Sequence, residues 1–407
     1  MLTQRGAQAD RGPDGRLHHS QHRTATNPAM PRARGSSGND RIGPRACHWR
    51  PHAIYARPMK VLLNKITSST RNARLSREVM LSPRIIAEEG SVLAVRALDR
   101  KSTYNEVEDI HGRMATVNQG DILAGVLGER RALHGYSGII PEKVDAGDII
   151  HLLNLGGVLG LCTSANPDVG PACRVEVLGQ VQHFPHLGER VGQPATIRTN
   201  AIPAVDLITR SIPLIYVSGT CMNAGKTFAA CEIIRGLTTR GFRVGAAKLT
   251  GVSLRRDTLK MHDVGAIRAL NFNDAGIVST RPQSAPAVAR NLVAALNEPV
   301  DGLPLDCIVM ELGDGIMGEY GVQEILRAPD LMAWTRAHVL CANDPVGAWG
   351  AMWWLREELG LHLTAISGPT TDNSVGRNFV IEKLNLPAVN ARSAGDELAG
   401  VVAATLR

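Results

Sequence analysis

The sequence predicts an α/β protein with a doubly wound, mostly parallel sheet in the C-terminal half, preceded by a smaller β-rich or α+β domain. Three observations lead to this prediction. Residues 59–203 contain short apolar runs separated by glycine-rich turns, with few helical stretches. Residues 204–407 alternate short apolar runs with longer amphipathic segments, which is typical of a parallel sheet. The first of these runs leads into a glycine-rich turn that ends in Gly-Lys-Thr at 225–227.

Residues 1–58 differ in composition from the rest of the 407-residue chain. They contain ten arginines and three aspartates but no lysine or glutamate, with many glycines and prolines and no apolar periodicity. The segment lacks the apolar region of a secretory signal. We therefore expect a disordered tail or a misassigned start, with the functional protein beginning at Met59.

The net charge of +7 lies entirely in that first segment, because the remainder has 35 basic and 35 acidic residues. A neutral folded part is not expected to bind nucleic acid. The seven cysteines are scattered without Cys-x-x-Cys spacing, which favours a reducing compartment over a zinc site or a disulfide framework. No run of about 18 apolar residues occurs, so we expect no membrane span and a cytoplasmic protein.

The β-rich segment 59–203 carries no motif that assigns it a role. Two Gly-Asp turns, at 120–121 and 147–148, each precede an apolar run that we interpret as a strand. The stretch LNLGGVLG at 153–160 is rich in glycine but lacks a following Gly-Lys-Ser/Thr. We interpret it as strand and turn rather than as a nucleotide loop.

The C-terminal segment 204–407 is expected to form one domain of six or seven strands with helices between them. The expected strands are Leu214–Ser218, Arg243–Lys248, Gly276–Ser279, Cys307–Glu311, His338–Ala342, Leu363–Ser367 and Ala388–Asn390. The first helix follows the glycine-rich turn, and its apolar residues recur at helical spacing. These residues are Ala230, Ile233, Ile234 and Leu237, and Gly241 ends the helix.

The turn between the first strand and the first helix has the composition of a phosphate-binding loop. Small residues allow backbone N–H groups to approach phosphates, and the N-terminus of the helix favours negative charge. Lys226 would supply a positive charge to the β- and γ-phosphates, and the Thr227 hydroxyl would bind Mg²⁺. The residues expected to bind the nucleotide are Gly219, Thr220, Met222, Asn223, Ala224, Gly225, Lys226, Thr227 and Phe228.

The loop has its first glycine one position earlier than the common G-x-x-x-x-G-K-S/T pattern, and Thr220 follows Gly219. This G-T-x-x-x-x-G-K-T form resembles P-loop proteins of the dethiobiotin synthetase and cobyrinic/cobyric acid synthase superclass. The resemblance covers Leu214–Thr250 closely, the rest of the C-terminal half only in its order of elements, and residues 1–200 not at all. It implies a bound nucleotide, ATP or alternatively GTP, with Mg²⁺. It also places Lys248, at the end of the second strand, near the phosphates.

The same resemblance implies acidic residues near the metal. Glu311 ends the strand in CIVMELGDG, where the superclass has an acidic residue near Mg²⁺, and Asp314 follows it. Asp257 and Asp263 lie where relatives place a metal- or substrate-contacting aspartate, although the spacing departs from the family pattern. The expected metal ligands are therefore Thr227, Glu311 and Asp257, and the expected catalytic residues are Lys226, Lys248 and Glu311.

Further candidates have both structural and functional interpretations. Arg255 and Arg256 would hold an anionic substrate or be solvated, and a lone His262 is interpreted as structural. Asp344 is expected to cap a helix that starts at Pro345, and with Asn343 it would alternatively face the site. The remaining candidates are Trp349, Trp353 and Trp354, interpreted as packing or a homodimer interface, and Ser367–Asp372, the segment where relatives contact adenine.

Two functional hypotheses follow. In the first, the protein is an ATP-dependent ligase or kinase-like enzyme that activates a small carboxylate as a mixed anhydride, which a nucleophile then attacks. The cysteine nucleophile of a glutaminase domain is absent from the sequence, so ammonia or another acceptor would come from elsewhere. In the second, the protein is a nucleotide-driven switch or a cofactor-assembly accessory protein. The molybdopterin-guanine dinucleotide accessory proteins and the metal-insertion NTPases exemplify this class.

Overall fold

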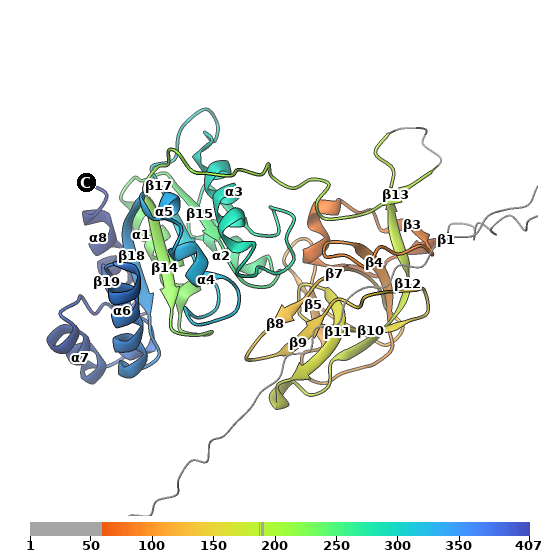
Figure 1. Ribbon diagram of the computed structural model, residues 1–407, viewed down its shortest axis with the longest axis horizontal. Helices are drawn as coiled ribbons and strands as arrows, with labels where there is room; N and C mark the ends of the chain where they lie inside the picture. The colour runs from red at the N-terminus through yellow and green to blue at the C-terminus, as the bar shows by residue number, and fades with distance from the viewer. Residues whose placement is uncertain (1–58, 187, 189–190) are drawn as a thin grey trace, which may run out of the picture. The chain divides into compact units, whose positions relative to one another are not determined.

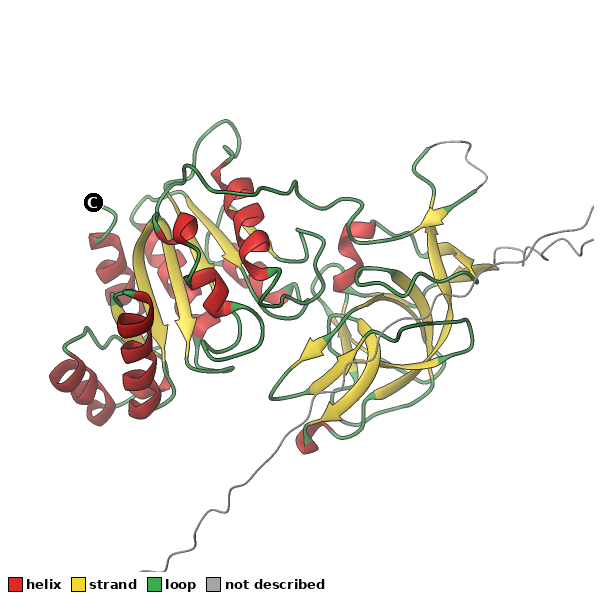
Figure 2. Cartoon of the chain, viewed as in Figure 1, coloured by secondary structure: helices red, strands yellow, loops and turns green. Residues whose placement is uncertain are grey.

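The computed structural model describes residues 59–186, 188 and 191–407 (Figure 1). The expectation of a disordered tail at 1–58 therefore lies outside the described residues. The described part contains an 11-stranded sheet, a six-stranded sheet and a two-stranded ribbon. The six-stranded sheet is entirely parallel and is flanked by helices, as Figure 2 shows. The predicted mixed α/β class is confirmed at this level.

Two separate apolar cores lie against the 11-stranded sheet, and β4 (Val92–Ala97) contributes to both because successive residues of a strand point to opposite faces. In β4, Val92 and Ala94 join one apolar core, whereas Leu93 and Val95 join another. Most neighbouring strands are antiparallel. The other strands are β1 (Met59–Leu62), β2 (Lys65–Ile66), β3 (Glu78–Ser82), β7 (Ile122–Leu127), β8 (Arg130–Arg131), β9 (Tyr136–Ile139), β10 (Ile149–Leu152), β11 (Val158–Ala165), β12 (Cys173–His183) and β13 (Gln193–Pro194).

Short elements accompany this sheet. The 3₁₀ helices η1 (Ser68–Ala73) and η2 (Pro167–Val169) lie in its connections, and β5 (Glu106–Glu108) and β6 (Met114–Thr116) form the two-stranded ribbon. The β-rich character predicted for this segment agrees with these elements.

The parallel sheet has the order β16-β15-β17-β14-β18-β19. Its first strand along the chain, β14, therefore lies inside the sheet between two strands that come much later in the sequence. Ligands of open α/β sheets bind at the carboxyl ends of strands where the strand order reverses. The strands are β14 (Leu214–Gly219), β15 (Val244–Lys248), β16 (Arg268–Asn271), β17 (Cys307–Glu311), β18 (Thr335–Cys341) and β19 (Ala365–Ser367).

Helices pack on both faces of the parallel sheet through separate apolar cores. The core on one face includes residues of α1 (Lys226–Thr239), α2 (Arg256–Asp263) and α8 (Gly395–Ala404). The four α1 residues predicted to be apolar contacts are all buried there. The core on the opposite face includes residues of α3 (Ala285–Asn297), α4 (Val322–Leu326), α5 (Pro329–Met332), α6 (Pro345–Leu359) and α7 (Ser374–Leu384). The 3₁₀ helix η3 (Pro369–Thr371) follows β19.

Two predicted strands of this half are wrong. The chain forms the edge strand at Arg268–Asn271 instead of Gly276–Ser279, where Ser279 makes only an isolated bridge to Val252. Segment 268–271 was missed because it is short and its alternate residues are only partly buried, so it has no continuous apolar run. Ala388–Asn390 is also not a strand, since only Ala388 bridges to Ile366. The other five predicted strands are present, with ends that shift by up to three residues.

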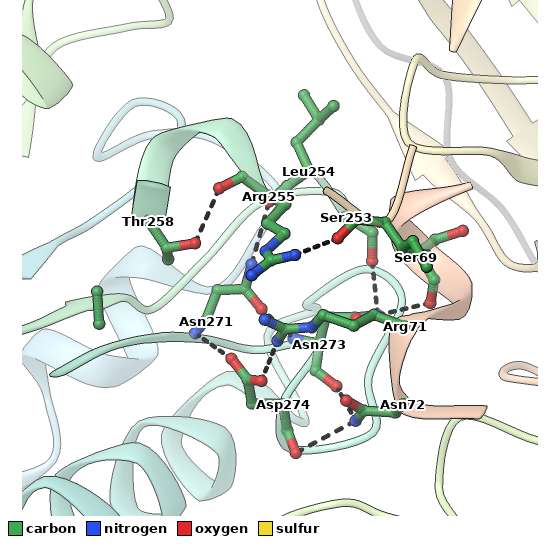
Figure 3. A network of polar contacts seen from close by, with 12 residues as sticks. Ser69, Arg71, Asn72, Ser253, Leu254, Arg255, Thr258, Asn271, Asn273 and Asp274 are labelled. Atoms are coloured by element: carbon green, nitrogen blue, oxygen red, sulfur yellow. Dashed lines mark hydrogen bonds and ion pairs between the residues drawn. The ribbon is translucent and has the colours of Figure 1, made fainter. Parts of the chain in front are cut away.

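Hydrogen bonds join the 11-stranded sheet segment to loops of the parallel sheet, and both belong to one compact unit (Figure 3). Asn72 donates through Nδ2 to the Asn273 carbonyl oxygen at 2.7 Å. Asn273 in turn donates to the Ser69 carbonyl oxygen at 3.2 Å. An ion pair between Arg71 and Asp274 lies beside them. These contacts tie η1 to the loop that follows β16.

No helix among the described residues combines the length and apolar character needed to cross a membrane.

Candidate functional site

The glycine-rich loop between β14 and α1 is tightly wound around the Lys226 side chain. Asn223 and Gly225 have φ angles of 61° and 90°, in the left-handed region. A Cβ atom at Gly219 would lie 2.8 Å from Cδ of Lys226, so glycine there leaves room for the lysine stem. The loop therefore packs closely around the lysine. The N–H groups of the first turn of α1 have no hydrogen-bond partner within the helix, as at any helix N-terminus.

Lys226 is almost entirely buried at the start of α1. It is 5% exposed, and its Nζ donates to the carbonyl oxygen of Cys221 at 2.7 Å. Burial lowers the pKa of Lys226, an effect that the negative charge of Glu311 partly opposes. The ammonium group of Lys226 is therefore buried and bound to a backbone carbonyl of the glycine-rich loop.

Thr227 and Glu311 meet at the carboxyl edge of the parallel sheet. The Thr227 hydroxyl donates from Oγ1 to Oε1 of Glu311 at 2.8 Å. Glu311 is 2% exposed, and its second oxygen, Oε2, is buried without a hydrogen-bond partner among the described residues. The sheet explains this meeting, because Glu311 is in register with Val217 of β14 on one side and with Lys248 of β15 on the other.

Lys248 lies between two carboxylates. Its Nζ forms an ion pair with Asp257 and is 3.6 Å from Oε1 of Glu311. Burial alone would lower the pKa of Lys248, but the charges of Glu311 and Asp257 outweigh it and raise this pKa. The same pairing with Lys248 holds the pKa of Asp257 below its ordinary value in spite of burial. The pairing thus favours the charged forms of both Lys248 and Asp257.

Helix α2, which carries Asp257, is held at its N-terminus by a carboxylate from the β-ribbon. Glu108 of β5 accepts the backbone N–H of Arg255 at 2.6 Å and that of Arg256 at 2.7 Å. Its side chain is completely buried. A carboxylate that accepts first-turn N–H groups stabilises a helix start. Glu108 therefore positions Asp257 and Arg256.

A cavity of about 480 Å³ lies over these residues. Its size is within the range of small-molecule sites. Residues of the glycine-rich loop, of the strand ends and of the β-rich segment all line it. They include Met222, Asn223, Gly225, Lys226, Thr227, Phe228, Lys248, Arg256, Asp257, Glu311, Asp314 and Tyr320, together with Tyr104, Arg130 and His134.

The other predicted candidates lie outside this lining. Gly219 ends β14, and Thr220 and Ala224 belong to the loop; none of the three lines the cavity, and Ala224 is fully buried. Asp263 is exposed at the end of α2. His262 is exposed at the same helix end, where its Nδ1 lies 2.9 Å from the carbonyl oxygen of Ala266. This contact is structural.

Two further candidates follow β18. Asn343 lies against the loop and donates through Nδ2 to Sγ of Cys221 at 3.0 Å. Asp344 caps α6 as predicted, accepting the N–H of Gly347 at 2.9 Å. The segment after β19 also touches the loop, since a Cβ at Gly368 would lie 2.5 Å from the Ala224 carbonyl oxygen. None of these residues lines the cavity.

The α6 tryptophans do not form a packed cluster. Trp349 and Trp353 are 52% and 44% exposed. Trp354 is partly buried, with the guanidinium carbon of Arg327 5.3 Å from its ring centroid. The packing interpretation therefore holds for Trp354 alone.

Among the residues that the sequence did not predict, four come from the β-rich segment: Glu108, Tyr104, Arg130 and His134. They come from a segment without any motif, and they reach the site only through the fold. Glu108 and Arg130 are buried charged residues, which are detectable only once burial is known, and no motif in the sequence singles out Tyr104 or His134.

A scan against protein-family models and a search of the curated proteins gave no match. Among solved structures, the chain is similar to a DUF1611 family protein from Anabaena variabilis, with 13% identity, a TM-score of 0.37 and coverage of 52% of this chain and 64% of that one. It is also similar to the signal recognition particle receptor FtsY from Elizabethkingia anophelis, with 11% identity, a TM-score of 0.32 and coverage of 52% and 68%. Chloroplast FtsY from Physcomitrella patens has 14% identity, a TM-score of 0.32 and coverage of 52% and 70%. The chain thus spans less than two thirds of the first of these proteins, and at such TM-scores the likeness assigns no function.

Proposed function

We propose that this protein is a Mg²⁺-dependent, ATP-binding P-loop enzyme that activates a small carboxylate substrate. One observation carries the proposal. Lys226, Thr227, Lys248 and Glu311 line one cavity, and Oε2 of Glu311 is buried there without a partner among the described residues. Two lysines, one buried and one partly buried, and a carboxylate oxygen without a hydrogen bond suit a ligand that brings phosphates and a cation.

The nucleotide phosphates would bind between the loop and the N-terminus of α1. The free first-turn N–H groups and the helix dipole favour an anion at this place. Lys226 would exchange its bond to the Cys221 carbonyl for the β- and γ-phosphates, which would relieve the cost of its burial. ATP is the proposed nucleotide and GTP the alternative, since the cavity lining carries no base-specific motif.

The residues present fit Mg²⁺. Thr227 and Glu311 offer a hydroxyl and a carboxylate oxygen, which are donors that Mg²⁺ prefers. A buried oxygen without a hydrogen bond is unfavourable unless a ligand satisfies it, and Oε2 of Glu311 is such an oxygen. When bound, the ion would neutralise phosphate charge. Asp257 is the third candidate, although Lys248 already pairs with it.

In the proposed reaction, a carboxylate oxygen of the substrate attacks the γ-phosphorus of ATP. The bond from that phosphorus to the β,γ-bridging oxygen breaks, and ADP and an acyl phosphate form. A nucleophile then attacks the acyl carbon, and inorganic phosphate leaves. Lys226 and Lys248 would stabilise the charge on the transferred phosphoryl group, since both line the cavity, Lys226 buried and Lys248 partly buried.

A second candidate function is a nucleotide-driven switch or cofactor-assembly accessory protein. One observation favours it: Glu108 links the β-ribbon to α2, which carries Asp257. A change at the nucleotide would thereby reach the β-rich segment. Slow hydrolysis that no small molecule accelerates would support the switch, whereas hydrolysis coupled to a carboxylic acid would support the enzyme.

Isothermal titration of the full chain with a non-hydrolysable ATP analogue and Mg²⁺ tests the proposal. We expect binding by the wild type and at least a tenfold loss in Lys226→Ala, because a charge-assisted contact to phosphate is removed. Lys383→Ala, at an exposed position of α7, is the matched control and should bind normally. A GTP analogue measures the base preference. Equal binding by Lys226→Ala and the wild type would reject the P-loop assignment.

A further inference from the structure

Arg130 is a buried cation without a carboxylate partner. It is 5% exposed, and it forms no ion pair with any acidic residue in the described ranges. Its Nη1 donates to Oη of Tyr104 at 2.7 Å and to the carbonyl oxygen of Leu153. Its Nε is buried with no hydrogen-bond partner among the described residues. The Arg130 guanidinium thus donates hydrogen bonds only to uncharged oxygens, and its Nε–H donates none within the described structure.

The neighbouring residue shows the contrast. Arg131, the other residue of β8, is exposed and pairs with Glu129 at 3.4 Å and with Glu319 at 3.3 Å. A buried charge is unfavourable unless an opposite charge accompanies it. The inward-facing arginine is therefore the one that lacks its counter-charge.

Arg130 lines the same cavity as Lys226 and Lys248. Two carboxylates already pair with Lys248, and Lys226 would bind the phosphates of the proposed nucleotide. Arg130 thus remains as a buried cation on a part of the lining that the β-rich segment contributes. Space is kept around it, because a Cβ atom at Gly135 would lie 2.5 Å from its Nη2.

We propose that Arg130 binds an anionic group of the acceptor substrate. This inference rests on the proposed function, since one carboxylate of that substrate must be activated beside the γ-phosphate. The substrate then carries two anionic groups: the carboxylate to be activated, and a carboxylate or phosphate held by Arg130. A guanidinium is suited to such a group because its planar N–H donors match two oxygens at once.

The test uses the full chain with Mg²⁺ and a non-hydrolysable ATP analogue. Succinate, glutarate and O-phosphoserine are titrated calorimetrically, with propionate and butyrate as singly charged controls. The wild type should bind at least one of the three doubly anionic compounds at least tenfold more tightly than the controls. In Arg130→Gln, the affinity for that doubly anionic compound should fall ten- to a hundredfold, whereas in Arg131→Gln it should stay unchanged. Arg130→Lys, which keeps the charge without the planar fork, should retain part of it.

Three results would overturn the inference. The first is that the wild type shows no preference for any of the doubly anionic compounds. The second is that Arg130→Gln and Arg130→Lys both retain the preference. The third is that Arg130→Gln weakens binding of the ATP analogue instead, which would assign Arg130 to the nucleotide. If the wild type does not bind the analogue, the proposed function fails, and the same titrations without nucleotide still report on Arg130.

Discussion

Glu311 has one oxygen bound to Thr227 and one without a partner in the described structure, and this asymmetry leads to a prediction. Glu311→Gln removes the negative charge but keeps the size of the side chain. We expect Mg²⁺-dependent binding of the ATP analogue to weaken tenfold or more, while binding in the presence of EDTA changes little. Titrations with and without Mg²⁺ measure both quantities. Glu298→Gln, at an exposed position, is the control, and equal losses with and without Mg²⁺ would contradict a metal role.

A second prediction at the residue scale concerns His338, which is buried in β18 with its Nε2 2.7 Å from Oγ of Ser218. Burial lowers the pKa of His338 from 6.5 to about 4. The unfolded chain therefore binds more protons than the folded chain between these pH values, and stability should fall as pH drops from 6.5 toward 4. The difference between the two pKa values corresponds to a decrease in the free energy of unfolding on the order of 3 kcal/mol.

Chemical denaturation of the wild type and of His338→Gln at pH 7 and pH 5 checks this dependence. Asp257 does not contribute to the difference between pH 7 and pH 5, because its lowered pKa keeps it ionised at both pH values. The variant should lose less stability between the two pH values than the wild type. An identical loss in both proteins would exclude His338 as the source.

At the scale of elements, the start of α2 depends on a side chain from a different sheet. Glu108→Gln should lower the free energy of unfolding by about 1–2 kcal/mol, because the buried acceptor of two backbone N–H groups loses its charge. Hydrogen exchange at the amides of Arg255 and Arg256 should accelerate. Glu106→Gln on the same strand, where the side chain is only partly buried, is the matched control. Unchanged exchange at both amides in Glu108→Gln would refute the cap.

At the scale of the whole molecule, the contacts of Figure 3 connect the β-rich segment to the loops beside the site. Asn273 also donates to Oγ of Ser253 at 3.1 Å, close to the segment that leads into α2. Binding of the ATP analogue should therefore slow hydrogen exchange in η1. Asn273→Ala should reduce this protection and destabilise the fold by about 1–3 kcal/mol, since the buried Ser69 carbonyl loses its donor. Asn378→Ala, at an exposed position of α7, should have neither effect.

The extent to which the fold and the candidate site could be predicted from the sequence differs between parts of the molecule. The strand, the glycine-rich loop and the first helix were predictable because their signals lie within about 25 residues. Segment 268–271 was not, because a short edge strand with half-buried residues has no distinct pattern. Arg130 and Glu108 were not predictable either, since a charged residue in a sequence without a motif is normally expected on the surface.

The sequence by itself determined the local features of this protein: the β-rich character of 59–203, the alternating strands and helices of 204–407, and the placement of Lys226 and Thr227 at a helix start. Periodicity and glycine spacing act over a few residues, so they can be read directly. Only the tertiary structure decided that Glu311 lies in register between Val217 and Lys248, that Glu108 holds α2, and that Arg130 lines the cavity. These relations depend on strand order and on burial, which arise when distant segments pair.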